Sequence, residues 1–293
     1  MKTVKKGLAL LISLVMVLSL TACGSLSAAK TIRKTMSAES CHADFKADVG
    51  LHLGMMEESI ADLNITLDGS GDLTSEPLRG AGDFRMEMID ETVDGRYYFV
   101  QEGDTLYLYS SPNGEDWSVS TVDLQGGSGG SGFSFSRESL AAMAAITKLF
   151  EETGTETING SEATVYSGTI RGEDLQALTQ EQGGDSTLPG GIDLSALGDI
   201  PVTVAVDRDT NRVARVTLDL SALSESLVPL VLKLGAQASA EDGEAGDADA
   251  LLDLMNALDI RFDRFLITVE LSDYDEVGEI TIPDEVISSA KAA

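Results

Sequence analysis

A strict alternation of apolar and polar residues after position 42 is the feature that most constrains the fold of this chain. From Ala43 to Met55, apolar side chains occupy the odd positions, and polar or small residues occupy the positions between them. Successive side chains of a β-strand point to opposite faces, so this segment predicts a long strand with one dry and one wet face. The pattern returns at residues 63–67 and 84–88. A one-residue shift would expose the whole apolar set, so the alternation also specifies the register.

Short polar turns separate further runs of strand-forming residues. Asp94-Gly95, Glu102-Gly103-Asp104 and Pro112-Asn113-Gly114 stand between runs rich in aromatic and β-branched residues. Short turns between such runs are typical of hairpins. Residues 43–122 are therefore predicted to form one antiparallel meander of about six strands.

The second half of the chain mixes strand-like and helix-like segments. Strands are predicted at 155–159, 163–170, 201–207, 212–220 and 265–271, and helices at 136–152, 172–182, 223–238, 250–258 and after Pro283. A further helix is predicted at 28–40, ahead of the meander. Segments 126–132 and 239–249 consist mainly of glycine, serine, alanine and acidic residues, which predicts mobile connections.

These elements predict an α+β fold with a single strongly curved antiparallel β-sheet, a half-barrel with helices packed on its concave face. Most of the strands have one polar face, as expected where one side of a sheet is solvated. A two-sheet sandwich is the alternative, but it would leave the apolar helices without a surface to cover.

The N-terminus predicts export from the cytoplasm. Lys2, Lys5 and Lys6 precede an unbroken run of apolar or small residues at 7–20. This run is too short to span the roughly 30 Å hydrocarbon core of a bilayer, but it has the length of a signal-peptide core.

The run ends in Leu20-Thr21-Ala22-Cys23, which resembles the lipobox of bacterial lipoproteins. The resemblance implies cleavage between Ala22 and Cys23, and attachment of a diacylglyceryl group to the Cys23 thiol. Residues 1–22 are then the lipoprotein signal peptide, 23–29 a tether and 30–293 a single domain. With Cys23 acylated, Cys41 is the only free thiol, so no disulfide forms within the chain and core burial must hold the fold.

The chain is strongly acidic, with 20 basic and 49 acidic residues and a formal net charge of -29. Nucleic-acid binding needs lysine and arginine to neutralise phosphates, so that function is excluded. The charge also argues against docking on an anionic membrane by electrostatics alone.

The whole pattern resembles the LolA/LppX-like (LprG-like) superfamily, and most closely the uncharacterised exported lipoproteins of Gram-positive bacteria. The resemblance is carried by the lipobox, the Met-rich strand at 84–88, the segments 103–109, 166–170 and 271–277, and the tail at 280–283. It covers most of residues 30–290, and implies a space between the sheet and the helices that holds acyl chains. The residues expected to line that cavity are Phe45, Val49, Leu51, Leu53, Phe84, Met86, Met88, Met143 and Ile146.

The sequence predicts neither an enzyme nor a metal site. Residues 126–130 match G-x-S-x-G, but they lie in a glycine run with both histidines upstream, so a linker is the better interpretation. Residues 207–211 begin like a calcium-binding loop, but Arg212 stands where that loop needs glycine. His42 and His52 share the polar face of one strand, and we expect them to be solvated. No cofactor is expected.

Two functions remain open from the sequence. The first is a membrane-anchored exported lipoprotein that binds a lipid or other apolar ligand in the cavity between sheet and helices. The second is a non-enzymatic interaction or structural lipoprotein of the cell surface with the same fold and a filled core. Both place the chain on the extracytoplasmic face of the cell membrane, held by its N-terminal diacylglyceryl anchor, and a dry cavity would favour the first.

Overall fold

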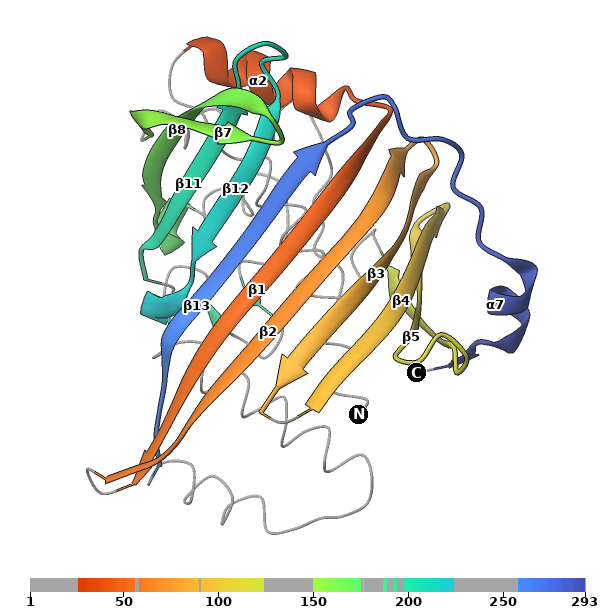
Figure 1. Cartoon of the computed structure of the whole chain (residues 1–293), viewed down its shortest axis with the longest axis horizontal. Coiled ribbons are helices and arrows are strands. Elements are labelled where there is room, and N and C mark those ends of the chain that lie inside the picture. Colours follow the sequence, from red (N-terminus) through yellow and green to blue (C-terminus); the bar gives the residue numbers. More distant parts are fainter. Residues whose placement is uncertain are drawn as a thin grey trace.

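The computed structural model describes residues 26–55, 58–89, 91–123, 150–174, 176, 187–188, 192–193, 198–223 and 258–292. Their main feature is one curved, unclosed sheet of twelve strands in the order β14-β6-β5-β4-β3-β2-β1-β13-β12-β11-β8-β7 (Figure 1). A separate two-stranded sheet joins β9 (Thr187–Leu188) and β10 (Ile192–Asp193). The predicted α+β fold with one curved, open sheet is confirmed, whereas most of the helices predicted on its concave face lie outside the described residues.

The first six strands form the predicted antiparallel meander. They are β1 (Ser40–Met55), β2 (Glu58–Ser75), β3 (Leu78–Met88), β4 (Glu91–Glu102), β5 (Thr105–Ser111) and β6 (Ser118–Asp123). Each strand pairs antiparallel with the next one along the chain. The turn predicted at Gly103 is present, and Gly103 has the positive φ of 59° that glycine adopts readily.

The second half of the chain extends the sheet from the other side of β1. In spatial order outward from β1 come β13 (Leu258–Ser272), β12 (Val213–Asp219), β11 (Ile200–Asp207), β8 (Ser161–Ile170) and β7 (Glu151–Ile158). All of these pairs are antiparallel. The two-residue strand β14 (Lys291–Ala292) pairs parallel with β6, so the sheet is mixed rather than purely antiparallel as predicted.

The described helices lie at the margins of the sheet. Helix α2 (Leu26–Met36) lies at the end of the sheet where β1 begins, and α7 (Asp284–Ser289) packs beside β4 and β5 (Figure 1). A short 3-10 helix, η3 (Ser221–Leu223), follows β12. Within the described residues, no helix is long and apolar enough to cross a membrane.

Several of the predicted helices end earlier than expected. The helix predicted at 28–40 ends at Met36, because Ser40 already opens β1. The helix predicted at 136–152 cannot include its last residues, because Glu151 opens β7. Likewise Leu258, the predicted end of the 250–258 helix, opens β13. The predicted mobile segments and most of the helices at 136–152, 172–182, 223–238 and 250–258 lie outside the described residues.

The turn predicted at Asp94-Gly95 is also wrong, because both residues lie inside β4. The chain reverses instead after β3, where Ile89 has a φ of 54°. Gly95 pairs with Phe84 of β3, and a Cβ atom at Gly95 would lie 2.3 Å from Phe84 Cζ. Glycine is needed here to admit a neighbouring ring and not to make a turn.

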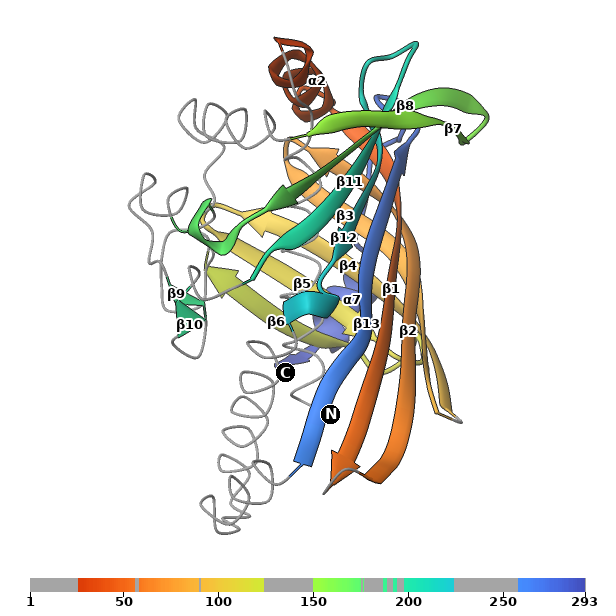
Figure 2. The same ribbon diagram turned by 90° about the vertical axis from the view of Figure 1, so that its left-hand side faces the viewer.

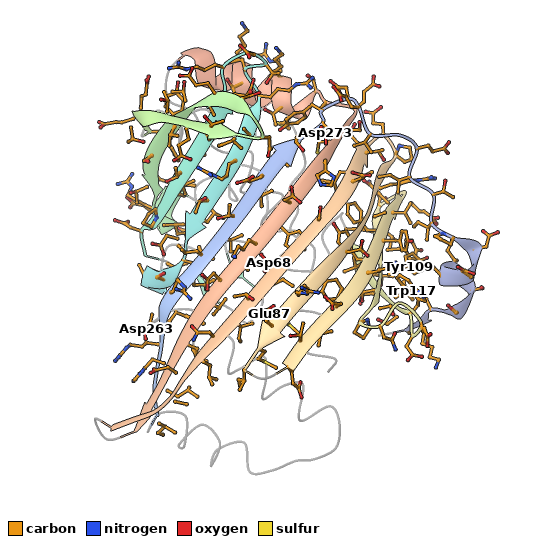
Figure 3. The ribbon with its side chains drawn as sticks, in the orientation of Figure 1. Asp68, Glu87, Tyr109, Trp117, Asp263 and Asp273 are labelled. Carbon is orange, nitrogen blue, oxygen red and sulfur yellow. The ribbon has the colours of Figure 1, made fainter. Side chains whose placement is uncertain are left out.

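The sheet has two chemically different faces. It curves so that its outer strands bend toward the same side (Figure 2). We call that side the concave face; it presents the odd-numbered residues of β1 from 45 to 53 and their cross-strand partners, and it holds the main core. The opposite, convex face presents Asp68, Glu87 and Asp263 outward (Figure 3). Near β4–β6 the convex face is covered by α7, whose Val286 packs with Tyr109 and Trp117.

Candidate functional site

Cross-strand pairs join the apolar residues of the concave face into continuous rows. Strand pairing places the members of each row opposite one another, so their side chains share one face. The first row runs Val204, Val216, Val269, Phe45, Gly69, Phe84 and Gly95. The second row runs Val202, Leu218, Ile267, Ala47, Leu67, Met86 and Val93.

Burial changes along these rows from one side of the sheet to the other. On β11 and β12, Val204 and Val216 are 0% and 2% exposed. On β1 and β3, Phe45, Phe84 and Met86 are only half-buried. Met88, at the end of β3, is 38% exposed. The hydrophobic core therefore continues without a break into an apolar surface that the described fold leaves partly uncovered.

Aromatic rings on this face lie across glycines of the neighbouring strands. A Cβ atom at Gly69 would lie 2.0 Å from Phe45 Cζ, and one at Gly80 would lie 2.2 Å from Phe99 Cε1. Tyr97 reaches across in the same way, with its Oη 2.6 Å from the place where a Cβ of Gly82 would be. The rings thus occupy the space that side chains of β2 and β3 would fill. They form an aromatic layer that covers the sheet backbone.

The sequence analysis did not predict part of this aromatic layer. Tyr97, Phe99 and Leu108 form a second buried cluster, against which Phe45 and Phe84 pack. The rings of Phe45 and Tyr97 are tilted with centroids 6.4 Å apart, although two strands lie between them. The sequence does carry a signal for this contact, because β2 and β3 have glycine at alternate positions on the face that their neighbours fill with aromatic residues.

The predicted lining residues that the structure describes share one face of the sheet, and their role in lining a cavity stays a prediction. The described ones all belong to the concave face by their register, namely Phe45, Val49, Leu51, Leu53, Phe84, Met86 and Met88. Met143 and Ile146 lie outside the described residues, as do Ala22 and Cys23. The position of those four residues therefore stays a prediction.

The convex face carries several cross-strand ion pairs. Arg85 Nε lies 2.6 Å from Asp94 Oδ1, Arg96 Nε lies 3.1 Å from Asp83 Oδ1, and Lys46 Nζ lies 3.6 Å from Asp68 Oδ1. A shallow surface depression on this face is lined by the same side chains. Exposed pairs of this kind add little stability each, typically about 0.2–1 kcal/mol. Their arrangement leaves the convex face polar and the concave face apolar.

His42 contacts a serine and an aspartate on the convex face. Its Nδ1 lies 2.7 Å from Asp72 Oδ1 and its Nε2 lies 3.0 Å from Ser70 Oγ. Burial lowers the pKa of His42, but the hydrogen bond to Asp72 and the charges of Asp44 and Asp72 outweigh it and raise the pKa above its usual value.

This order of contacts resembles that of a hydrolytic triad, but it lacks a means of stabilising an oxyanion. Strand β2 is paired on both sides, so its N–H groups near Ser70 are engaged in the sheet. Asp44 and Asp83 flank Ser70 across the strands and would oppose a developing negative charge. We therefore assign no catalysis to these residues.

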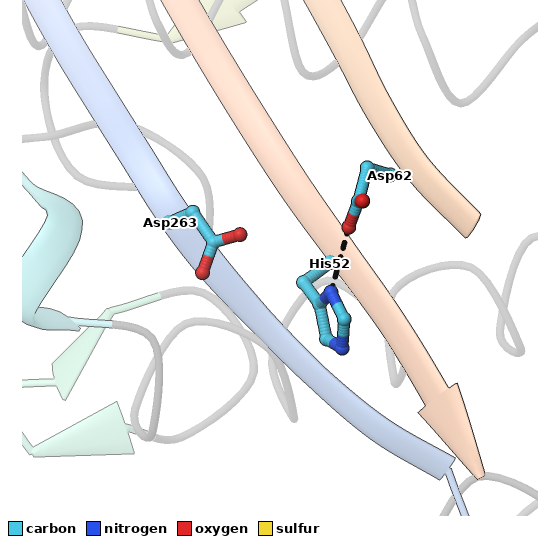
Figure 4. Close-up of side chains that lie close together, drawn as sticks. All are labelled: His52, Asp62 and Asp263. Atoms are coloured by element: carbon cyan, nitrogen blue, oxygen red, sulfur yellow. Dashed lines mark hydrogen bonds and ion pairs between the residues drawn. The ribbon is translucent and has the colours of Figure 1, made fainter. Parts of the chain in front are cut away.

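His52, Asp62 and Asp263 come together from β1, β2 and β13 (Figure 4). One potential ligand atom from each lies within 4.8 Å of the others, which is close enough to share a metal ion. His52 Nδ1, however, already lies 2.7 Å from Asp62 Oδ1, and Arg261 Nε lies 3.1 Å from Asp263 Oδ1. Each of the two histidines thus has an aspartate of β2 directly across the strands as its partner, Asp72 for His42 and Asp62 for His52, which explains the cluster without a metal.

Comparison with known proteins finds similar proteins only among solved structures. No protein-family model matches the chain, and no curated protein matches its sequence. The lipoprotein LppX of Mycobacterium tuberculosis matches with 15% identity and a TM-score of 0.40, over 87% of this chain and 96% of LppX. LprF from Mycobacterium bovis matches with 14% identity and a TM-score of 0.37, over 90% of this chain and 99% of LprF.

The chain resembles LppX and LprF. These matches agree with the resemblance to LppX-like proteins stated from the sequence. At such low identity the likeness concerns the fold alone.

Proposed function

We propose that this chain is an exported lipoprotein, held in the cell membrane through acylated Cys23, that binds an apolar ligand such as a lipid acyl chain on its concave face. The observation that carries the proposal is the partly uncovered apolar surface on β1 and β3, which is continuous with the core. No described group of nucleophile, base and oxyanion donors supports a catalytic role instead.

The chemistry of the concave face favours an apolar ligand over a charged one. Neither of its two rows contains a charged side chain, and the cations of the neighbouring strands are engaged in ion pairs on the convex face. Covering apolar surface contributes roughly 25 cal/mol per Å². The flexible thioethers of Met86 and Met88 can adapt to ligands of different shape.

The membrane attachment rests on the sequence of the N-terminus. Leu20-Thr21-Ala22-Cys23 has the lipobox pattern, and a diacylglyceryl group supplies two acyl chains. Two chains give stable attachment to a bilayer, whereas one chain alone is marginal. An anchored protein with an apolar face could take up a lipid from the membrane that holds it.

A matched pair of substitutions in β3 tests the ligand proposal. Met86 and Glu87 are neighbours, so their side chains point to the concave and the convex face respectively. We expect the mature chain to bind a fluorescent fatty-acyl probe. Met86→Trp fills the concave face and should weaken binding about tenfold or more, the equivalent of about 1.4 kcal/mol. Glu87→Trp adds the same side chain to the other face and should leave the affinity unchanged.

Fluorescence titration of the three proteins measures these affinities, and circular dichroism checks that each variant is folded. If the parent chain does not bind the probe, or if both tryptophan variants bind as tightly as the parent, the ligand proposal is wrong. A cell-surface interaction lipoprotein with a filled core would then be the better account.

A further inference from the structure

Helix α2 differs in charge from the rest of this acidic chain. It contains no acidic residue, and Lys30, Arg33 and Lys34 are all exposed on it. Residues three and four positions apart in a helix lie on the same face, so these three cations form one basic face. We call these three residues the basic face of α2.

The basic face of α2 has no acidic partner within the described residues. Elsewhere in the described chain, most basic side chains are paired with aspartate or glutamate. Those in ion pairs are Lys46, Arg85, Arg96, Arg171, Arg208, Arg212, Arg215, Arg261 and Arg264. In a chain with 49 acidic residues, three neighbouring cations without an acidic partner among the described residues are suited to bind an external anion.

Two buried threonines fix which side of α2 faces outward. Thr31 and Thr35 are 1% and 6% exposed, and they lie four residues apart on the inner side of the helix. Thr31 Oγ1 donates to Asn211 Oδ1 at 3.1 Å, and the Val213 N–H donates to Thr35 Oγ1 at 3.0 Å. These bonds hold the helix against the start of β12, so the basic face must point away from the sheet.

The basic face also lies close to the expected anchor. Helix α2 begins at Leu26, three residues after Cys23, and three residues of chain span at most about 11 Å. The helix lies at one end of the sheet, and the β1–β2 and β3–β4 hairpin ends lie at the other (Figure 1). Strand β2, with 18 residues, places the β1–β2 hairpin about 60 Å from the α2 end, and β3, with 11 residues, places the β3–β4 hairpin about 35 Å from it.

We propose that the basic face of α2 rests on anionic lipid headgroups of the membrane that carries the Cys23 anchor, and so sets the orientation of the sheet on the bilayer. Each basic residue near an anionic membrane surface strengthens binding about fivefold. The acidic remainder of the chain is repelled by the same surface. The sheet therefore stands with its α2 end at the membrane and its β1–β2 and β3–β4 hairpins pointing away. This inference rests on the proposed anchor.

Quenching by lipid measures this orientation in the acylated protein. The mature chain with Ser37→Cys, labelled with a fluorophore next to α2, is reconstituted in vesicles that contain a lipid-attached quencher. Burial, together with the charges of Asp72 and Asp275, raises the pKa of Cys41 to about 11, so this thiol remains largely unlabelled. We expect strong quenching in phosphatidylglycerol vesicles, and several-fold less in phosphatidylcholine vesicles or at high salt.

A pair of triple variants and a second label position separate the basic face from other effects of charge. The triple variant Lys30→Gln, Arg33→Gln, Lys34→Gln should lose the dependence on phosphatidylglycerol. The variant Lys46→Gln, Arg85→Gln, Arg96→Gln removes the same charge from the convex face and should keep that dependence. A label placed at the far end through Ile89→Cys, where the native side chain is 70% exposed, should stay unquenched in both kinds of vesicle.

The outcomes distinguish this inference from the proposed function. Equal quenching at residue 37 in both vesicles, or no effect of the α2 triple variant, would overturn the orientation while leaving the anchor intact. Stronger quenching at residue 89 than at residue 37 would reverse the orientation. Failure of the acylated chain to float with the vesicles would overturn the anchor itself, and this inference with it.

Discussion

Gly82→Ala is expected to lower the free energy of unfolding by about 1–3 kcal/mol, the range typical of overpacked interiors. A Cβ atom at Gly82 would lie 2.2 Å from the carbonyl oxygen of Ser70 and 2.6 Å from Tyr97 Oη. The first of these atoms belongs to the backbone of β2, so the strand itself must shift to admit a methyl group. Denaturant unfolding followed by circular dichroism measures the change.

Gly50→Ala provides the matched control for this prediction. Gly50 lies inside β1, and the nearest atom to a Cβ there would be Arg264 Cβ at an ordinary 3.5 Å. Alanine also restricts the unfolded chain, so this variant should be neutral or more stable by about 0.4–1 kcal/mol. Equal destabilisation by the two substitutions would contradict the view that Gly82 is needed for close packing under the Tyr97 ring.

Loss of the Cys23 thiol is expected to release the chain from the membrane completely. To avoid retention by an uncleaved signal peptide, the mature chain with Cys23→Ala is exported behind a signal peptide that ordinary signal peptidase removes. Without the acyl chains, the sequence after residue 22 has no apolar run long enough to span a bilayer. Cell fractionation with a high-salt wash should recover this variant in the soluble fraction.

Cys41→Ala, made in the chain with its own signal peptide, is the control for the anchor. Cys41 lies in β1, inside the folded domain, so its replacement should leave the protein in the membrane fraction. If the Cys23→Ala chain sediments with membranes as the parent does, the anchor lies elsewhere and the lipobox interpretation is wrong.

The sequence predicted the two faces of the sheet well, because alternation alone decides which side chains share a face. Phe45, Val49 and Leu51 obey this rule, and their pairing to β13 and β2 agrees with it. The alternation at 63–67 also placed β2 in the meander. These predictions needed no knowledge of which strands are neighbours.

The sequence was less informative wherever a glycine makes room for the side chain of a neighbouring strand. The second half of β2, from Gly69 to Ser75, is rich in glycine and serine and lacks a long apolar alternation, so its strand was missed. In the structure the Phe45 ring fills the place of a side chain at Gly69. That requirement depends on strand pairing, which local propensity does not contain. The turn predicted at Asp94-Gly95 is wrong for the same reason, because Gly95 makes room for the Phe84 ring of the neighbouring strand.

The basic face of α2 shows a second limit of sequence reasoning. Lys30, Arg33 and Lys34 are visible as a group in the sequence, but a group of cations in an acidic protein is normally neutralised by its surroundings. Only the packing of Thr31 and Thr35 against the start of β12 reveals that this face points outward. Its lack of acidic partners among the described residues is a property of the tertiary structure.

The most direct test of the proposed function is mass spectrometry of what the protein carries from the cell. The soluble Cys23→Ala chain is purified without detergent, denatured and extracted with organic solvent, so that its own acyl anchor does not contribute. We expect a lipid or fatty-acyl species in near-stoichiometric amount from the Cys23→Ala chain, and much less of it when Met86→Trp is added than when Glu87→Trp is added. Extracts with no such species, or with equal amounts from the two variants, would contradict binding on the concave face.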